Sequence, residues 1–149
     1  MSSSVERARR LVLFTRLPTI GHTKTRLIPA LAAAGAAALH GRLVETLLGA
    51  LRDHRQRWRA PTEIELRFTG GSPEELHRWL GSCDDLRLAP QGEGGLGERM
   101  HRAFCQANAQ GASSTLLFGS DVPDLTPTIL EQAFGALASG ADAVFGPAE

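Results

Sequence analysis

The sequence predicts an α/β fold built on a mainly parallel sheet, from two observations. Short apolar runs at residues 11–14 and 114–120 are typical of strands buried on both faces. Segments with apolar residues at helical spacing alternate with strand-like runs along the chain, as in βαβ units. The length of 149 residues is enough for one domain with its own core. We therefore expect residues 1–149 to form a single α/β domain of three layers.

In the first half of the chain, the first strand is the run LVLF at 11–14. Four leucines then recur every four residues and predict an amphipathic helix over 36–54, with the alanine-rich LAAAGAAAL as its entry; they are Leu39, Leu43, Leu47 and Leu51. Segment 62–69 alternates apolar and charged residues, which predicts a strand with one exposed face. Ser72 and Pro73 then begin a short helix that ends near Gly81.

The second half repeats this alternation. The expected elements are a strand at 86–89, a helix from Leu96 to Gly111, a strand at 114–120, a helix from Pro127 and a last strand at 141–146. We expect the apolar face of the first of these helices to hold Leu96, Met100, Ala103, Phe104 and Ala107.

Composition limits the function classes. Lys plus Arg and Asp plus Glu both number 16, so no overall charge favours a nucleic acid or an acidic membrane as partner. No stretch is apolar for the roughly 18 residues of a membrane span, and LVLF is too short for the core of a signal peptide. We expect a cytoplasmic protein in which Cys83 and Cys105 are ordinary thiols.

Ligands of an open parallel sheet bind outside the carboxyl ends of its strands, and three polar loops follow such ends. The first, FTRLPTIGHTKTRL at 14–27, places Arg16, Lys24 and Arg26 around a turn shaped by Pro18 and Gly21. These side chains suit the phosphates of a nucleotide, although a solvated basic loop would have the same sequence. A P-loop is excluded, because its second glycine is replaced here by threonine.

The second loop, APQGEGGLGERM at 89–100, contains glycines that let a ligand approach the backbone, next to the N-terminus of a helix. Here Gln91 is placed to contact a base and Arg99 a phosphate. A plain flexible turn would have the same composition.

The third loop, FGSDVPDLT at 118–126, follows a buried strand and delivers Asp121 to its carboxyl end. Asp124 or Thr126 is expected to cap the next helix, which leaves Asp121 as the candidate ligand for Mg²⁺ or Mn²⁺. His40 shares a helix face with leucine and valine, so we expect it to be packed rather than catalytic.

The motifs at 14–27, QGEGGLGERM at 91–100, GSDVPDLT at 119–126 and GPAE at 146–149 occur in one order. Together they resemble a bacterial family of GT-A-type glycosyltransferases associated with arsenosugar biosynthesis, in the nucleotide-diphospho-sugar transferase superfamily. The resemblance implies that strands 11–14 and 114–120 are central and that 62–69 lies further out.

The resemblance also implies roles for individual residues. Arg16, Lys24 and Arg26, in the loop of Gly21, would hold the diphosphate of a nucleotide. Gln91, Gly97 and Arg99 would contact the nucleotide, and Asp121 would bind the metal ion. Asp121 and Lys24 are thus the expected catalytic residues.

Members of that family continue with an acidic, tyrosine-containing segment, whereas this sequence ends at Glu149 and has no tyrosine. We therefore expect a C-terminally short chain whose last strand invites pairing with a second copy in a homodimer. The expected function is transfer of a sugar from a nucleotide-sugar donor to an unknown small-molecule acceptor. The alternatives are a nucleotidyltransferase acting on a nucleoside triphosphate and a non-catalytic nucleotide-binding module.

Overall fold

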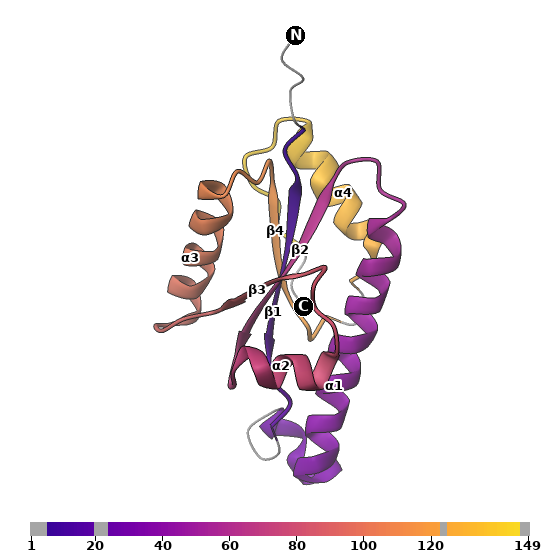
Figure 1. Cartoon of the computed structure of the whole chain (residues 1–149), viewed down its shortest axis with the longest axis vertical. Coiled ribbons are helices and arrows are strands. Elements are labelled where there is room, and N and C mark those ends of the chain that lie inside the picture. Colours follow the sequence, from indigo (N-terminus) through magenta and orange to yellow (C-terminus); the bar gives the residue numbers. More distant parts are fainter. Residues whose placement is uncertain (1–5, 20–23, 123–124, 147–149) are drawn as a thin grey trace.

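In the computed structural model, which describes residues 6–19, 24–122 and 125–146, the strands form a parallel sheet in the order β3-β2-β1-β4 (Figure 1). The strands are β1 (Arg9–Arg16), β2 (Thr62–Thr69), β3 (Arg87–Pro90) and β4 (Thr115–Gly119). The helices are the 3₁₀ turn η1 (Thr25–Leu27), α1 (Ile28–Arg55), α2 (Pro73–Leu80), α3 (Leu96–Ala109) and α4 (Pro127–Ala138). The predicted α/β class with a parallel sheet is confirmed.

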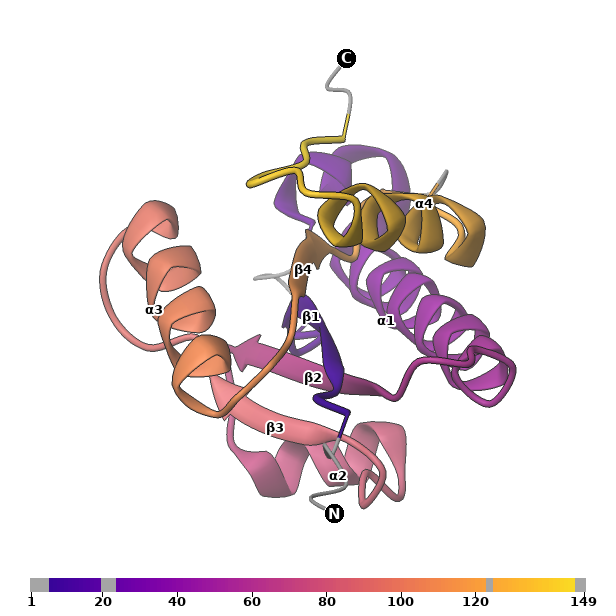
Figure 2. The ribbon, with the colours of Figure 1, turned by 90° about the horizontal axis from the view of Figure 1, so that it is seen from above.

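Alternation along β1 divides the core between the two faces of the sheet, because successive side chains of a strand point to opposite sides. Leu11 packs with residues of α1 and α4, and Leu13 packs with Leu76 of α2. Val12 and Phe14 face the other way and contact α3. Figure 2 shows the resulting three layers, with α3 alone on its face of the sheet.

The strand order creates a switch point between β1 and β4. The chain adds β2 and then β3 on one side of β1, and after α3 it returns to add β4 on the other side. The loops that follow β1 and β4 therefore leave the same end of the sheet, and both lead to helices on one face, α1 and α4. In such sheets ligands usually bind outside the carboxyl ends of the strands, near the switch point.

Two helix starts follow the predicted capping chemistry. The Ser72 hydroxyl accepts a hydrogen bond from the Glu75 backbone N–H (3.2 Å), and the Thr126 hydroxyl accepts one from that of Ile129 (3.3 Å). In both helices proline is the first helical residue, where its missing N–H costs nothing. Thr126 is thus the cap of α4, as one of the two expected alternatives held, while Asp124 lies outside the described residues.

The prediction that β2 has an exposed face is wrong. Glu65 and Arg67 are 2% and 1% exposed, because α3 covers them and they pair with one another. The predicted order is also wrong for two strands: β2 lies inside the described sheet, and β4 lies at its edge. Alternating polarity was therefore a sign of a buried ionic layer, not of contact with solvent.

Three further expectations are corrected. Helix α1 begins at Ile28, before residue 36, with a kink where Ala32 leaves helical geometry (φ 57°, ψ 166°). On α3 the small residues Ala103 and Ala107 are buried, whereas Leu96 and Phe104 are 65% and 41% exposed. Residues 141–146 form no strand in the described structure; they are exposed and pair with no other segment.

The segment Thr25–Arg55 contains an 18-residue window with a mean hydropathy of 1.5, so its length and composition would allow it to cross a membrane. The expectation that no stretch meets this test is therefore wrong. Core helices of globular proteins pass the same test, and α1 packs Val44, Leu48 and Leu51 in the protein interior.

Asp85 joins α1 to the turn before β3 through Arg52 (2.9 Å) and Arg55 (2.7 Å). Burial raises the pKa of Asp85, but the hydrogen bonds from these arginines outweigh burial and lower it below its ordinary value of 3.8. A lowered pKa in the folded state means stability that is present above the unfolded-state pKa and is lost as the pH falls. We expect Asp85→Asn to lower the free energy of unfolding at pH 7 and to flatten its decline below about pH 4. Urea denaturation at several pH values measures both effects, and an unchanged decline would contradict the prediction.

Candidate functional site

The carboxyl end of β1 is fixed by a buried histidine. His40 of α1 is 5% exposed, and its Nε2 lies 2.5 Å from the backbone carbonyl oxygen of Arg16. Because a carbonyl only accepts, Nε2 carries the proton and donates. The ring stacks on Trp79 of α2 (centroids 6.4 Å apart, 30° between planes). His40 is therefore a packed residue, as predicted, and it anchors the start of the basic loop.

Lys24 and Asp121 form an ion pair that joins the loop after β1 to the loop after β4. The Lys24 side chain is 14% exposed and the Asp121 side chain 69% exposed, so the carboxylate of the pair faces solvent. Lys24 has a left-handed backbone conformation (φ 48°, ψ 50°), which is uncommon for a residue with a side chain. Two residues 97 positions apart in the sequence thus meet at the switch point of the sheet.

Gln91 and Arg99 also lie together, at the carboxyl end of β3 and the start of α3. The Gln91 side chain is buried: its amide nitrogen donates to the carbonyls of Thr15 (3.0 Å) and Arg67 (3.2 Å). Its amide oxygen accepts from Arg99 (3.2 Å), whose Nε donates to the Gly94 carbonyl (2.9 Å). The Gln91 amide, which the sequence predicts to contact a base, is thus already hydrogen-bonded within the protein.

The other predicted residues take separate positions. The aliphatic part of Arg16 lies beside Gly70, where an added Cβ would be 3.3 Å from Arg16 Cγ, on the β2 side of β1. Arg26 is exposed in η1, and Gly97 is exposed in the first turn of α3. Gly21 lies outside the described residues. The structure thus forms two pairs, Lys24–Asp121 and Gln91–Arg99, on loops that leave the same edge of the sheet.

The acidic groups can be compared with what a divalent cation requires. Within the described ranges, no three His, Cys, Asp or Glu side chains gather into a metal-binding group. Mg²⁺ in nucleotide sites takes one or two carboxylates and completes its shell with phosphates and water. The single carboxylate of Asp121 fits an ion that arrives with phosphates. It does not fit an ion held by protein ligands alone.

Two adjoining shallow hollows beside the end of β1 could not be predicted from the sequence. They have volumes of about 320 and 340 Å³ and share Pro18 and Trp79; the first lies between α1 and α2, and the second between residues 17–19 and α2. Small residues of α1 form one wall; a Cβ added to Gly41 would lie 3.6 Å from Trp79 Nε1. Only the packing of the two helices determines that Trp79 faces this position.

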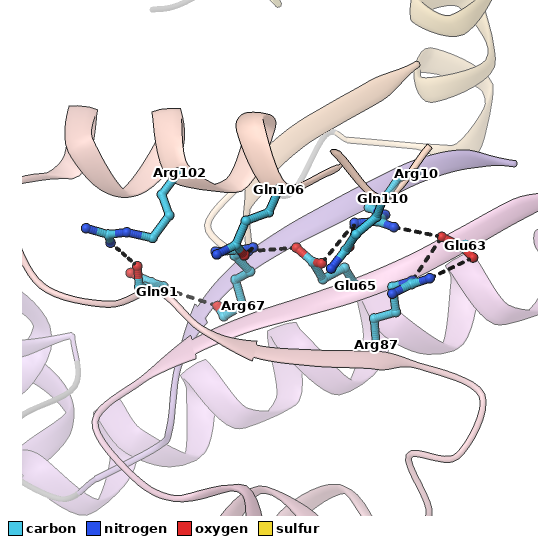
Figure 3. Close-up of polar contacts among 9 residues, drawn as sticks. All are labelled: Arg10, Glu63, Glu65, Arg67, Arg87, Gln91, Arg102, Gln106 and Gln110. Carbon is cyan, nitrogen blue, oxygen red and sulfur yellow. Dashed lines mark hydrogen bonds and ion pairs between the residues drawn. The ribbon is translucent and has the colours of Figure 1, made fainter. Parts of the chain in front are cut away.

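The largest group of residues that the sequence analysis missed is a buried ionic layer under α3 (Figure 3). Glu65 lies between Arg10 (3.3 Å) and Arg67 (2.7 Å), and all three side chains are at most 3% exposed. Glu63 continues the layer to the surface, where it pairs with Arg87 (3.0 Å). Gln106 of α3 and Gln110, which directly follows this helix, accept hydrogen bonds from the buried arginines. Among the described residues, Arg10 Nε and Arg67 Nη1 are buried without a partner.

Comparison with known proteins places this chain in a family. Residues 51–149 match the profile of a family described as "Uncharacterized protein conserved in bacteria (DUF2064)". A crystal structure of a "putative nucleotide-diphospho-sugar transferase" from Desulfovibrio desulfuricans G20 superposes with a TM-score of 0.75 at 29% identity. The match covers 88% of this chain and 55% of that one, so the chain spans little more than half of its structural relative. A search of curated proteins finds no significant match. The chain belongs to the DUF2064 family and has the fold of a nucleotide-diphospho-sugar transferase.

Proposed function

We propose that the protein is a metal-dependent glycosyltransferase that uses a nucleotide-sugar donor. The observation that carries the proposal is the pairing of Lys24 with Asp121 at the switch point between β1 and β4. A cation and a carboxylate at this position suit a diphosphate and its metal ion. The similarity to a nucleotide-diphospho-sugar transferase supports the same ligand class.

In this proposal the basic loop binds the diphosphate of the donor. The ammonium of Lys24 leaves Asp121 and pairs with a phosphate oxygen, with Arg16 and Arg26 as further cations of the same segment. Asp121, together with the phosphates of the donor, would hold Mg²⁺ or Mn²⁺. When bound, the ion supplies charge neutralisation for the leaving nucleoside diphosphate. Lys24 adds a fixed positive charge at the same group.

A nucleotidyltransferase is the second candidate, because a lysine between the first strand and helix suits the phosphates of a nucleoside triphosphate equally well. The two reactions release different products. A glycosyltransferase releases a nucleoside diphosphate, and a nucleotidyltransferase releases pyrophosphate. A non-catalytic nucleotide-binding module would release neither.

We extend the proposal to a small-molecule acceptor and a cytoplasmic location. The acceptor is unknown, and the same product assay can be run with candidate acceptors.

The proposal is tested in two steps. Melting of the protein is first followed with UDP, GDP, CDP, dTDP and their sugars, with and without Mn²⁺; a ligand at 100 times its dissociation constant stabilises by about 2.7 kcal/mol. The nucleotide that stabilises most is then supplied as a nucleotide sugar and as a triphosphate, and the products are separated. We expect stabilisation that depends on Mn²⁺ and release of the diphosphate. A folded sample whose melting no nucleotide changes would refute the ligand class.

A further inference from the structure

Two arginines of α3 hold the glycine-rich loop in place through its backbone carbonyls. Arg102 Nη1 donates to the carbonyl of Gln91 (2.7 Å), and Arg102 Nη2 donates to that of Glu93 (3.0 Å). Arg99 adds a bond to the Gly94 carbonyl (2.9 Å). Figure 3 shows Arg102 reaching Gln91 from the helix above the strands. One planar guanidinium thus spans two peptide groups of the loop.

The loop is built to accept Arg102 at close range. Gly92 has φ +84°, and a Cβ added there would lie 2.4 Å from Arg102 Nη1. Any side chain at Gly92 would therefore meet backbone strain and displace the guanidinium. At the start of the loop, the buried Gln91 side chain also ties the backbone to β1 and β2. The loop is fixed from both sides without filling its exposed face.

The carbonyl contacts determine where the amides of the loop point. In a planar trans peptide, the C=O of one residue and the N–H of the next point in opposite directions. Because Arg102 binds the carbonyls of Gln91 and Glu93, the N–H groups of Gly92 and Gly94 point away from it. In the part of the chain that the structure describes, neither N–H donates a hydrogen bond, and both glycines are exposed.

We propose that Arg102 is a positioning residue for the nucleotide site: it holds the Gly92 and Gly94 amides turned outward, where they donate to an oxygen of the bound nucleotide. This inference rests on the proposed function and deepens it. In the same inference, the role of Gln91 is to hold the loop. Arg102 itself touches no ligand, and its effect passes through two peptide groups.

The test uses the ¹⁵N-labelled full chain and the nucleoside diphosphate that stabilises it most, added with Mg²⁺. In the wild type we expect the amide resonances of Gly92 and Gly94 to shift on titration. Arg102→Met keeps the packed stem and removes both donors. It should weaken nucleotide binding by about tenfold, the effect of losing a charge-assisted hydrogen bond between the glycine amides and the nucleotide, and it should abolish the glycine shifts. Shifts near Lys24 and Asp121 should persist.

Two variants separate positioning from a general loss of structure. Arg102→Lys retains the charge but cannot span two carbonyls, so it should give intermediate affinity. Millimolar guanidinium should restore binding to Arg102→Met. Arg55→Ala removes an arginine bond of the same kind, to the Asp85 carbonyl (2.9 Å), at the opposite edge of the sheet, and should leave affinity unchanged. Urea denaturation gives the folded fraction of each variant.

The outcomes distinguish this inference from the function on which it rests. Wild-type affinity in a folded Arg102→Met variant would overturn it. So would shifts near Lys24 and Asp121 without shifts at Gly92 and Gly94, and the proposed function would then stand. If no nucleotide shifts any amide of the wild type, the proposed function fails and the inference fails with it.

Discussion

Lys24→Ala should weaken the binding of a nucleoside diphosphate by about 10- to 100-fold in EDTA and should tighten the binding of Mn²⁺ to the complex of protein and diphosphate. The reason is that the Lys24 ammonium and the metal ion require the same carboxylate, that of Asp121. Without the ammonium, the carboxylate is free for the ion. The diphosphate meanwhile loses a cationic partner, so its affinity falls even without metal.

Asp121→Asn should have the reciprocal effect. The asparagine no longer holds the ammonium, so diphosphate binding in EDTA should become tighter than in the wild type. Binding should also lose its dependence on Mn²⁺, because the amide replaces the charged metal ligand. Asp142→Asn, which changes another exposed carboxylate of the described chain, is the matched control and should alter neither affinity.

Titration calorimetry with and without EDTA measures the affinity for the diphosphate, and electron paramagnetic resonance measures the concentration of free Mn²⁺.

The exchange of partners can also be followed directly, because Lys24 is the only lysine among the 149 residues. Reductive ¹³C-methylation therefore labels one side chain besides the N-terminus. Its resonance should move when the diphosphate and Mg²⁺ bind together. Equal Mn²⁺ affinity in the diphosphate complexes of the wild type and Lys24→Ala would show that the two cations do not compete.

Glu65→Gln should destabilise the fold by about 3–5 kcal/mol, the usual effect of removing one partner from a buried ion pair. Glu65 is 2% exposed and lies between two buried arginines, so the neutral amide leaves Arg67 without its carboxylate partner and Arg10 with Glu63 alone. This is a large part of the 5–15 kcal/mol that stabilises a typical domain. Arg67→Met should have a smaller effect, because Glu65 keeps its contact with Arg10.

Glu63→Gln provides the control, since it makes the same substitution two residues earlier on the same strand. The Glu63 side chain is 37% exposed, so its ion pairs with Arg10 and Arg87 are screened by solvent. We expect a loss below about 1 kcal/mol. Urea denaturation of the three variants at pH 7 makes the comparison. Equal effects of Glu65→Gln and Glu63→Gln would mean that the layer is not the continuous buried unit described above.

The elements of the fold could be predicted where local rules act alone. The bounds of β2 and the caps at Ser72 and Thr126 follow from alternation, hydroxyl capping and proline at the first helical position. The candidate loops could be located because each follows a strand of a parallel sheet. What could not be predicted is how Gln91 and Arg99 would be used, because their partners include carbonyls of Thr15 and Arg67 that are distant in the sequence.

The sequence by itself determined the α/β class, the alternation of strands and helices, and the identity of the three loops at the carboxyl ends of strands. These depend on periodicity and turn chemistry within a few residues. Only the tertiary structure decided that Lys24 meets Asp121 and that Arg102 holds the glycine loop. It also decided that the charged face of β2 is buried under α3. The reason is that strand order and helix placement bring together residues far apart in the chain. A sequence also does not show whether a charged side chain is surrounded by water or by another charge.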